Sequence, residues 1–350
     1  MPPEAIALSS FSGGSLLSVS VVMPVYNAAA FLEAAISSVL GQTYRHLEFI
    51  VVDDGSTDAS RDVLRAFASR DARVRPLFLP HGGLSRAINS GIAVAKGELI
   101  ARMDADDVSA PERFEVQVEW MRRTGVDICG TGAREFGEVQ SGRKHGIFLN
   151  AATHRGTCYE MLFGAGMLHP TTMMRADLGR RFPLDGKASC EDYEFYVRIA
   201  PHCRMGNVPK ILLRYRRHPE QRSVLDGSAI DEDLSRYRRP HFFSLFPDAP
   251  EQDYAVVASV AEKKPFSGIA GLARAGEILS LLAEEEDAVL RFRMARRWWG
   301  ACLRSASLGP GVHRLYNEVQ PALHVPPQGD PERLRLACGS RPGAPGPATG

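Results

Sequence analysis

The first hundred residues alternate short β-branched segments with segments of helical periodicity, and this alternation limits the possible folds more than any other feature. Strands are expected at 18–23, 47–52, 74–79 and 98–103, with apolar residues recurring at helical spacing between them. Strands joined through helices imply right-handed crossovers and a mostly parallel sheet that is covered on both faces. We therefore predict an α/β fold whose ligands bind beyond the carboxyl ends of the strands.

Two of the four expected strands lead directly into acidic clusters. Asp53 and Asp54 follow the second strand, and Asp104, Asp106 and Asp107 follow the fourth. Hard divalent cations such as Mg²⁺ and Mn²⁺ prefer carboxylate oxygens together with substrate phosphates. Aspartate is also common in turns and at helix starts, so an Asp-x-Asp sequence alone fits a cation site or a turn equally well.

An acid after the second strand is also typical of dinucleotide-binding folds. Such folds need a glycine-rich turn after the first strand, where the pyrophosphate approaches the backbone. Here the turn at 24–30 reads Pro-Val-Tyr-Asn-Ala-Ala-Ala, and no glycine lies between Met23 and Gly41. The sequence therefore argues against NAD. Asp54 then either belongs to a strand-to-helix turn or binds a nucleobase or a ribose hydroxyl.

Short polar motifs mark expected helix starts. Ser56 or Thr57 is expected to cap the second helix, and Ser109 with Glu112 forms a capping box after the fourth strand. Farther along, the pattern becomes an irregular mixture of helix and strand and then reads as helical over residues 228–335.

Charge and cysteine content exclude several classes of protein. Lysine plus arginine total 42 against 41 acidic residues, so the net charge of +1 gives no basis for a general nucleic-acid binder. Six scattered cysteines without a C-x-x-C pair indicate reduced thiols instead of a disulfide framework or a zinc site. No run approaches the roughly 18 apolar residues of a membrane span, and no basic region opens the N-terminus. We therefore expect a cytoplasmic protein.

Four motifs in order resemble those of the family 2 glycosyltransferases, which have the GT-A fold. They are Val-Met-Pro-Val-Tyr-Asn at 22–27, Val-Asp-Asp-Gly-Ser-Thr-Asp at 52–58, Asn-x-Gly with Ala-x-Gly-Glu within 89–98, and Met-Asp-Ala-Asp-Asp at 103–107. The resemblance covers residues 18–220. It implies an enzyme that moves a sugar from a UDP- or dTDP-type nucleotide sugar to a hydroxyl acceptor, with inversion, in the assembly of cell-surface polysaccharide or glycan.

The resemblance also implies roles for single residues. The implied nucleotide-binding residues are Pro24, Val25, Tyr26, Asp54 and Asp104, with the Tyr26 ring against the base and Asp54 at a uracil-type imide. By itself, Tyr26 would fit a half-buried core aromatic as well. Asp106 is implied to contact a divalent cation, Mn²⁺ or Mg²⁺, that bridges the diphosphate.

The reaction asks for one more group, because a hydroxyl is a poor nucleophile and needs a base as it attacks the sugar. The family's Glu-Asp motif matches Glu191 and Asp192, which makes Asp192 the implied base and Glu191 the alternative. The spacing of Ser189 and Asp192 is also that of a capping box, which needs no catalysis.

Two further segments match the family less closely. His169, within Gly-Met-Leu-His-Pro-Thr-Thr, resembles the acceptor side of the cleft, although a histidine before proline also fits the start of a strand. The stretch 215–223 resembles the segment that closes over the diphosphate, where His218 would complete the metal shell and Arg216 or Arg217 would face phosphate. The alternative for this stretch is a solvated run of charge.

The expected domains are a disordered N-terminus at 1–17, a GT-A domain at 18–225, a helical extension at 226–335 and a disordered tail at 336–350. Within the extension, residues 290–304 carry several arginines together with Trp298 and Trp299. Such a basic helix either rests on an anionic membrane, at the inner face and beside a lipid-linked acceptor, or packs on its own domain.

The expected partners are a nucleotide-sugar donor and a glycan or lipid-linked acceptor. The chain lacks the Gln-x-x-Arg-Trp motif of processive synthases, which favours the addition of one sugar per encounter. Two other functions are considered. A nucleotidyltransferase would need a glycine-rich basic loop after the first strand, and a catalytically degenerate fold would bind nucleotide sugar without transferring it.

Overall fold

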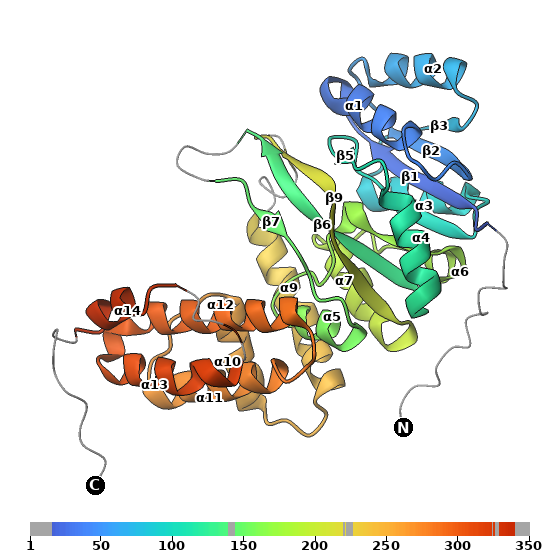
Figure 1. Ribbon diagram of the computed structural model, residues 1–350. Coiled ribbons are helices and arrows are strands. Elements are labelled where there is room, and N and C mark those ends of the chain that lie inside the picture. The colour runs from blue at the N-terminus through green and yellow to red at the C-terminus, as the bar shows by residue number, and fades with distance from the viewer. Residues whose placement is uncertain are drawn as a thin grey trace, which may run out of the picture. The chain divides into compact units, whose positions relative to one another are not determined.

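The computed structural model describes residues 16–138, 144–219, 221, 227–323, 325 and 329–339, with the backbone alone for 227–231. The chain forms two compact units (Figure 1). The first comprises the described parts of Met1–Cys158 and Ala165–Leu234, and the second those of Tyr159–Gly164 and Ser235–Gly350.

A nine-stranded sheet organises the first unit, in the order β3-β2-β1-β4-β8-β6-β9-β5 with β7 paired to β6. Its strands are β1 (Val19–Val25), β2 (Leu47–Asp54), β3 (Val74–Leu79), β4 (Leu99–Arg102), β5 (Val108–Ser109), β6 (Ile128–Gly137), β7 (Ile147–Phe148), β8 (Met173–Arg175) and β9 (Met205–Arg217). The first four strands are parallel. The sheet is mixed beyond them, because β8 runs antiparallel to both β4 and β6. The α/β prediction is confirmed, and parallel pairing recurs in the second half between β6 and β9.

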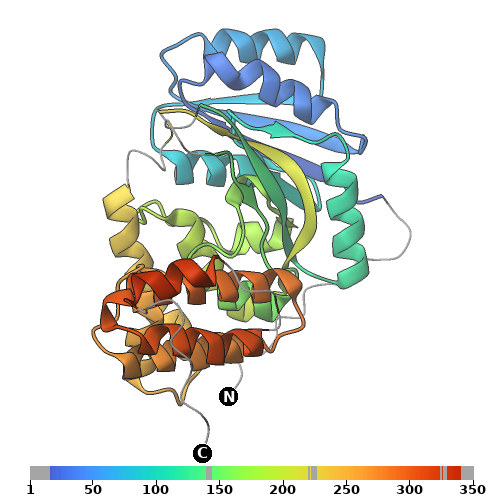
Figure 2. The same cartoon turned by 60° about the vertical axis from the view of Figure 1, so that its left-hand side comes forward.

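Helices cover both faces of the parallel strands (Figure 2). The helices of this unit are α1 (Ala29–Leu40), α2 (Ser60–Arg70), α3 (Leu84–Val94), α4 (Arg113–Thr124), α6 (Ala176–Arg181) and α7 (Glu191–Ile199), and α5 (His154–Glu160) begins in it. All seven residues of β1 are buried, as expected for a strand with helices above and below. On the α3 side the approach is close, since a Cβ on Gly91 would lie 2.5 Å from the Val22 side chain.

The four strands expected from the sequence all form, each within two residues of its predicted bounds. The capping predictions at Ser56, Thr57 and Ser109 are wrong. Helix α2 begins after Ala59 and α4 after Glu112, in both cases without a side-chain cap, and Ser109 lies in β5. Its backbone N–H donates to the Ser38 hydroxyl of α1, so a tertiary hydrogen bond replaces the local one.

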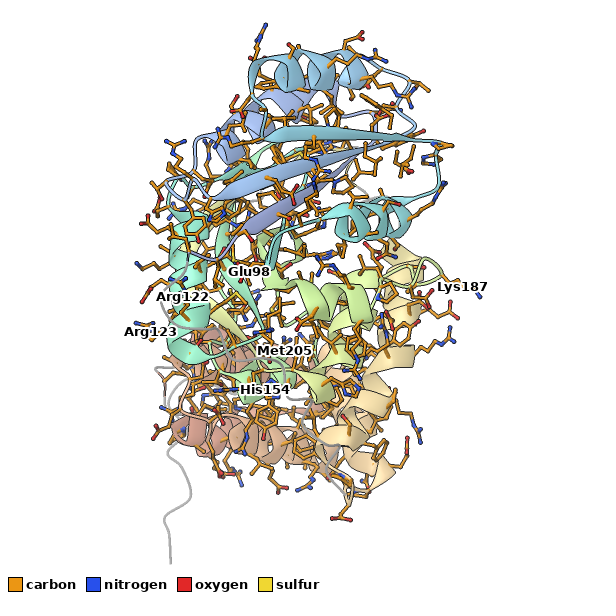
Figure 3. All side chains as sticks on the ribbon, turned by 90° about the vertical axis from the view of Figure 1, so that its right-hand side faces the viewer. Glu98, Arg122, Arg123, His154, Lys187 and Met205 are labelled. Carbon is orange, nitrogen blue, oxygen red and sulfur yellow. The ribbon has the colours of Figure 1, made fainter. Side chains whose placement is uncertain are left out.

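The region that the sequence predicted as an irregular mixture of helix and strand contains β6 to β9, which extend the same sheet beyond β4. At the start of β9, the Met205 N–H donates to Nδ1 of His154 on α5 at 3.2 Å (both residues are labelled in Figure 3). The opposite end of β9 pairs with β5, with Val108 opposite Arg214. This pairing brings the residues after Tyr215 to the loop that follows β4.

The second unit is helical. It contains most of α9 (Gly227–Leu245), followed by α10 (Glu251–Ala261), α11 (Ile269–Leu282), α12 (Ala288–Arg304), α13 (Gly311–Val319) and α14 (Pro331–Ala337). Asp287 caps α12 by accepting from the N–H groups of Val289 and Leu290. None of the helices in the described parts of the chain combines the length and apolar composition that a bilayer crossing requires.

The two tryptophans of α12 are used in packing. Trp298 is fully buried against Gly276, and Trp299 lies edge-on to Tyr316 with 5.6 Å between ring centroids. The structure thus favours packing within the unit for the 290–304 helix. The disorder predicted at 1–17 and 336–350 falls mostly outside the described residues, although Leu17 is buried in the core of the first unit and α14 extends to Ala337.

Candidate active site

Three aspartates meet in the loop between β4 and β5. One carboxylate oxygen from each of Asp104, Asp106 and Asp107 lies within 4.8 Å of the others. The end of β9 adds two contacts to this loop. The Arg216 N–H donates to Asp107 at 2.8 Å, and Nε2 of His218 lies 3.1 Å from Oδ2 of Asp106. The structure thus brings together the residues predicted as metal ligands.

The negative charges of the acidic loop are destabilised by burial and by mutual repulsion. Burial, followed by repulsion from Asp104, raises the pKa of Asp106. Burial, followed by repulsion from Asp106 and Asp104, raises the pKa of Asp107 well above its usual value. Asp107 is fully buried, and its Oδ2 has no hydrogen-bond partner among the described residues. Clustered carboxylate oxygens with an orphaned buried atom fit a hard divalent cation, which would neutralise them.

Two buried arginines that the sequence analysis missed stabilise this loop. One contacts it directly, and the second contacts the first. Arg102 is 2% exposed, and its Nη2 lies 2.8 Å from Oδ1 of Asp104. Arg113 of α4 is fully buried and donates to the Arg102 carbonyl at 2.6 Å. Burial lowers the pKa of Arg113 to about 10, an effect that the nearby Asp107 opposes. A charged residue inside an otherwise apolar buried strand was the signal that could have revealed Arg102.

The turn after β1 is held by the motif at 52–58. The Asn27 N–H donates to the Ser56 hydroxyl at 3.0 Å, and the Thr57 N–H donates back to the Asn27 side chain at 2.8 Å. Asn27 adopts a φ of 49°, which asparagine tolerates better than most residues. The hydroxyls expected to cap α2 therefore shape this turn instead. Tyr26 is 49% exposed there, so it is not a core aromatic.

Pro24 and Val25 precede this turn within β1. Both are buried, and Val25 belongs to the hydrophobic core. Of the three residues implied to line the base pocket, Tyr26 is the one that presents its side chain to solvent.

Asp54 organises the loop after β3. Its two carboxylate oxygens accept the N–H groups of Gly82 and Gly83 at 2.9 and 2.8 Å. Nδ1 of His81 lies 3.0 Å from the Asp54 carboxylate, and the His81 ring stacks on Tyr26 at 4.3 Å. The structure therefore joins Asp54 and Tyr26, predicted as nucleotide contacts, through a histidine that the sequence analysis did not single out.

Asp192 is the second residue of α7. The capping-box alternative is wrong, because Cys190 precedes the helix without a side-chain cap and the Ser189 N–H donates to Asp233 at 2.7 Å. Asp192 is half-buried, whereas Glu191 is buried. Both Asp192 and Arg102 lie close enough to Tyr196, one turn farther along α7, to alter its pKa. Helix α7 therefore lies beside the carboxyl end of β4.

His169 contacts the same tyrosine. It sits in a single 3₁₀ turn at His169–Thr171, ahead of β8, and its ring is edge-on to Tyr196 at 6.0 Å. Burial, assisted by the positive charge of Arg102, holds the pKa of His169 well below its usual value. The imidazole is therefore neutral at physiological pH.

Arg216 and Arg217 have different surroundings. Nε of Arg216 donates to the Asp106 carbonyl at 2.7 Å, and its guanidinium lies over the Phe31 ring, so it belongs to the acidic loop. The Arg217 guanidinium lies 2.6 Å from Glu135, whose side chain is 1% exposed. We infer that Arg217 stabilises the sheet instead of facing phosphate.

Replacing Arg217 by methionine is therefore expected to lower stability without affecting nucleotide binding. The variant leaves the buried Glu135 carboxylate without its arginine, which should reduce the free energy of unfolding by about 3 kcal/mol in chemical denaturation. The matched control is Arg214→Met, an exposed arginine of the same strand, with an expected change below about 1 kcal/mol. Loss of nucleotide binding at unchanged stability would place Arg217 at the phosphate instead.

Residues 20–178 match the protein family described as glycosyl transferase family 2. The chain is 31% identical over 233 residues to an uncharacterized glycosyltransferase of Haemophilus influenzae, covering 63% of this chain and 72% of that protein. It is 32% identical over 215 residues to the O-antigen biosynthesis glycosyltransferase WbnJ of Escherichia coli, covering 59% and 83%.

Two solved structures share the fold. S. aureus TarS in complex with UDP-GlcNAc superposes with a TM-score of 0.54 at 17% identity, covering 88% of this chain and 86% of that one. The mannosyltransferase PcManGT of Pyrobaculum calidifontis, in complex with GDP-Man and Mn²⁺, gives 0.51 at 19% identity, covering 88% and 85%.

Proposed function

The chain belongs to glycosyltransferase family 2 and is a glycosyltransferase of the GT-A fold, and from that premise we propose that it uses a UDP- or dTDP-type sugar donor and inverts the anomeric carbon. The proposal extends to a divalent cation, to a base and to a hydroxyl acceptor. Each part depends on residues at the carboxyl edge of the parallel strands, where ligands bind in sheets of this kind.

The observation that carries the proposal is the acidic loop with His218 beside it. Asp106 and His218 would hold Mn²⁺ or Mg²⁺, with Asp104 toward the ribose or the sugar. The cation would neutralise the diphosphate leaving group. PcManGT, which shares the fold, was solved with Mn²⁺ and a nucleotide sugar, in keeping with this assignment. Arg216 stands at the same loop and would add positive charge toward the phosphates.

The nucleobase would stack on the exposed Tyr26 ring, with Pro24 and Val25 beneath it. Asp54 would accept the imide N–H of the base. Oδ2 accepts the Gly83 N–H and lies 3.0 Å from Nδ1 of His81, whereas Oδ1 accepts the Gly82 N–H and has a second lone pair to offer. Its bonds to the Gly82 and Gly83 N–H groups would hold the carboxylate in place for this contact.

Asp192 would take the proton of the acceptor hydroxyl as it attacks the sugar. The N-terminal end of a helix favours the charged form of a carboxylate, so Asp192 would be available as a base. Such a weak base suits a proton transfer that occurs late, once the acceptor oxygen has become acidic. Glu191 is the alternative, and the neutral, buried His169 would line the acceptor side without adding charge.

The acceptor would be a hydroxyl of a growing surface polysaccharide, extended by one sugar per encounter. The likeness to WbnJ, named for O-antigen biosynthesis, supports this class of acceptor. A membrane contact through Trp298 is not favoured, because its side chain is buried within its own unit. The cytoplasmic location stays a prediction. A nucleotidyltransferase is not favoured, because the turn at 24–30 has no glycine or basic residue.

A screen of nucleoside diphosphates by thermal shift, with Mn²⁺ or with EDTA, tests the donor class. We expect UDP or dTDP to raise the Tm only with Mn²⁺, by an amount that corresponds to about 2.7 kcal/mol at a ligand concentration of 100 times Kd. UMP, which lacks the diphosphate, is the matched control and should show no dependence on Mn²⁺. A shift with GDP alone would change the donor class, and no shift with any diphosphate would refute the proposal.

A further inference from the structure

Arg297 of α12 has no acidic partner among the described residues. Its guanidinium is half-buried over the Phe163 ring, with 4.3 Å between the guanidinium carbon and the ring centroid. Its Nε is buried and has no acceptor in the part of the chain that the structure describes. Stacking covers one face of a guanidinium, but the N–H bonds point outward in its plane and still need acceptors. The ring contact therefore leaves Arg297 unsatisfied.

The surroundings of Arg297 are also positively charged. One turn earlier on α12, Nε of Arg293 lies 2.7 Å from the fully buried Glu160 carboxylate. Arg238 of α9 is 3% exposed and lies 3.0 Å from Glu262, but its Nε also has no acceptor. The second oxygen of Glu262 binds Lys264 at 2.7 Å. The carboxylates of Glu160 and Glu262 are therefore engaged by other cations, and the charged side chains named here carry an excess of positive charge.

The same imbalance affects the titration of Arg297. Burial, together with repulsion from Arg293 and Arg238, lowers its pKa to about 9, although Glu160 acts in the opposite direction. Arg297 is still protonated at neutral pH. A guanidinium that is partly removed from water and has no acidic partner among the described residues is unfavourable, and free energy is recovered when an anion pairs with it.

We propose that Arg297, with Arg238 and Arg293 around it, forms an anion site in the second unit and that this site binds a phosphate group. A dianionic phosphate matches the excess charge, and its oxygens fit the in-plane N–H bonds of guanidinium groups. A soluble phosphate ester and a lipid headgroup share this chemistry. The site consists of residues of the second unit alone and does not depend on the proposed donor site.

The first test compares Arg297→Met with Arg293→Met in phosphate-free buffer with EDTA. Methionine keeps apolar contact with Phe163 and removes the unpaired charge, so the Tm of Arg297→Met should equal or exceed that of the unchanged protein. Arg293→Met should lower the Tm, because it leaves the buried Glu160 carboxylate without its arginine. If Arg297→Met lowers the Tm as well, or fails to fold, Arg297 is a structural residue and the proposal is refuted.

The second test measures binding with inorganic pyrophosphate. EDTA is kept in the buffer so that the probe does not bind through a cation at Asp106, and sodium chloride at equal ionic strength controls for screening. We expect pyrophosphate to raise the Tm saturably in the unchanged protein and in Arg296→Met, an exposed neighbour on α12, but not in Arg297→Met. An equal rise in Arg297→Met, or no saturable rise in the unchanged protein, would overturn the assignment.

A vesicle experiment identifies the source of the phosphate. The full chain is cosedimented with phosphatidylcholine vesicles that contain or lack phosphatidate. A pyrophosphate response together with phosphatidate-dependent cosedimentation that Arg297→Met abolishes would support the site with a lipid headgroup as its ligand. A pyrophosphate response without cosedimentation would support the site with a soluble phosphate. Phosphatidate-dependent cosedimentation that is unchanged in Arg297→Met, without a pyrophosphate response, would contradict it.

Discussion

Replacing Asp106 by alanine is expected to abolish the Mn²⁺-dependent binding of the nucleoside diphosphate and to reduce sugar transfer by about 1,000-fold or more. The carboxylate is proposed to hold the cation that neutralises the leaving group, and a cation in that role contributes several kcal/mol to the barrier. Binding is measured by calorimetry with Mn²⁺ and with EDTA, and transfer by release of the nucleoside diphosphate.

The stability of this variant distinguishes the proposed role from a structural one. Burial and repulsion from Asp104 raise the pKa of Asp106, so its removal relieves repulsion in the loop. Without metal, the variant should therefore be about as stable as the unchanged protein. Asp62→Ala, at an aspartate that is 79% exposed on α2, is the matched control and should change neither binding nor transfer. If Asp106→Ala still binds the nucleoside diphosphate in a Mn²⁺-dependent way, Asp106 is not a metal ligand.

The second large effect is expected at Asp192. Asp192→Asn, which keeps the shape of the side chain, should retain Mn²⁺-dependent nucleotide binding and lose transfer by about 100- to 10,000-fold, the usual contribution of a general base. Asp192→Ala should behave in the same way. A single-turnover measurement at saturating donor separates the loss of chemistry from any loss of binding.

Glu191→Gln is the matched control on the neighbouring residue. Glu191 is buried where Asp192 is half-buried, and its replacement is expected to affect transfer far less. If Glu191→Gln loses transfer while Asp192→Asn proceeds at the original rate, the base is Glu191. If both variants keep the original rate, the base lies elsewhere, although the metal assignment would still stand.

Helix caps predicted from local sequence patterns were wrong where the polar residues form hydrogen bonds with other segments instead. Ser56 was expected to cap α2 but accepts the Asn27 N–H from the neighbouring turn. A capping box at Ser189 was the alternative to a catalytic Asp192, but the Ser189 N–H donates to Asp233, 44 residues away. A capping motif describes only neighbours in the sequence, and hydrogen bonds to distant segments compete with it on equal terms.

The sequence by itself determined the parallel strands, the family, and the placement of Asp54 and Asp106 at strand ends, because these follow from short-range periodicity and from motifs of adjacent residues. Only the tertiary structure decided what each charge faces. The pairing of β9 with β6 and β5 sends Arg217 to Glu135 and Arg216 to the acidic loop, although the two are neighbours in the chain. The packing of α12 places the Arg297 guanidinium over Phe163, with no acidic partner among the described residues. Charge partners are chosen by contacts between segments far apart in the sequence, and no local pattern encodes them.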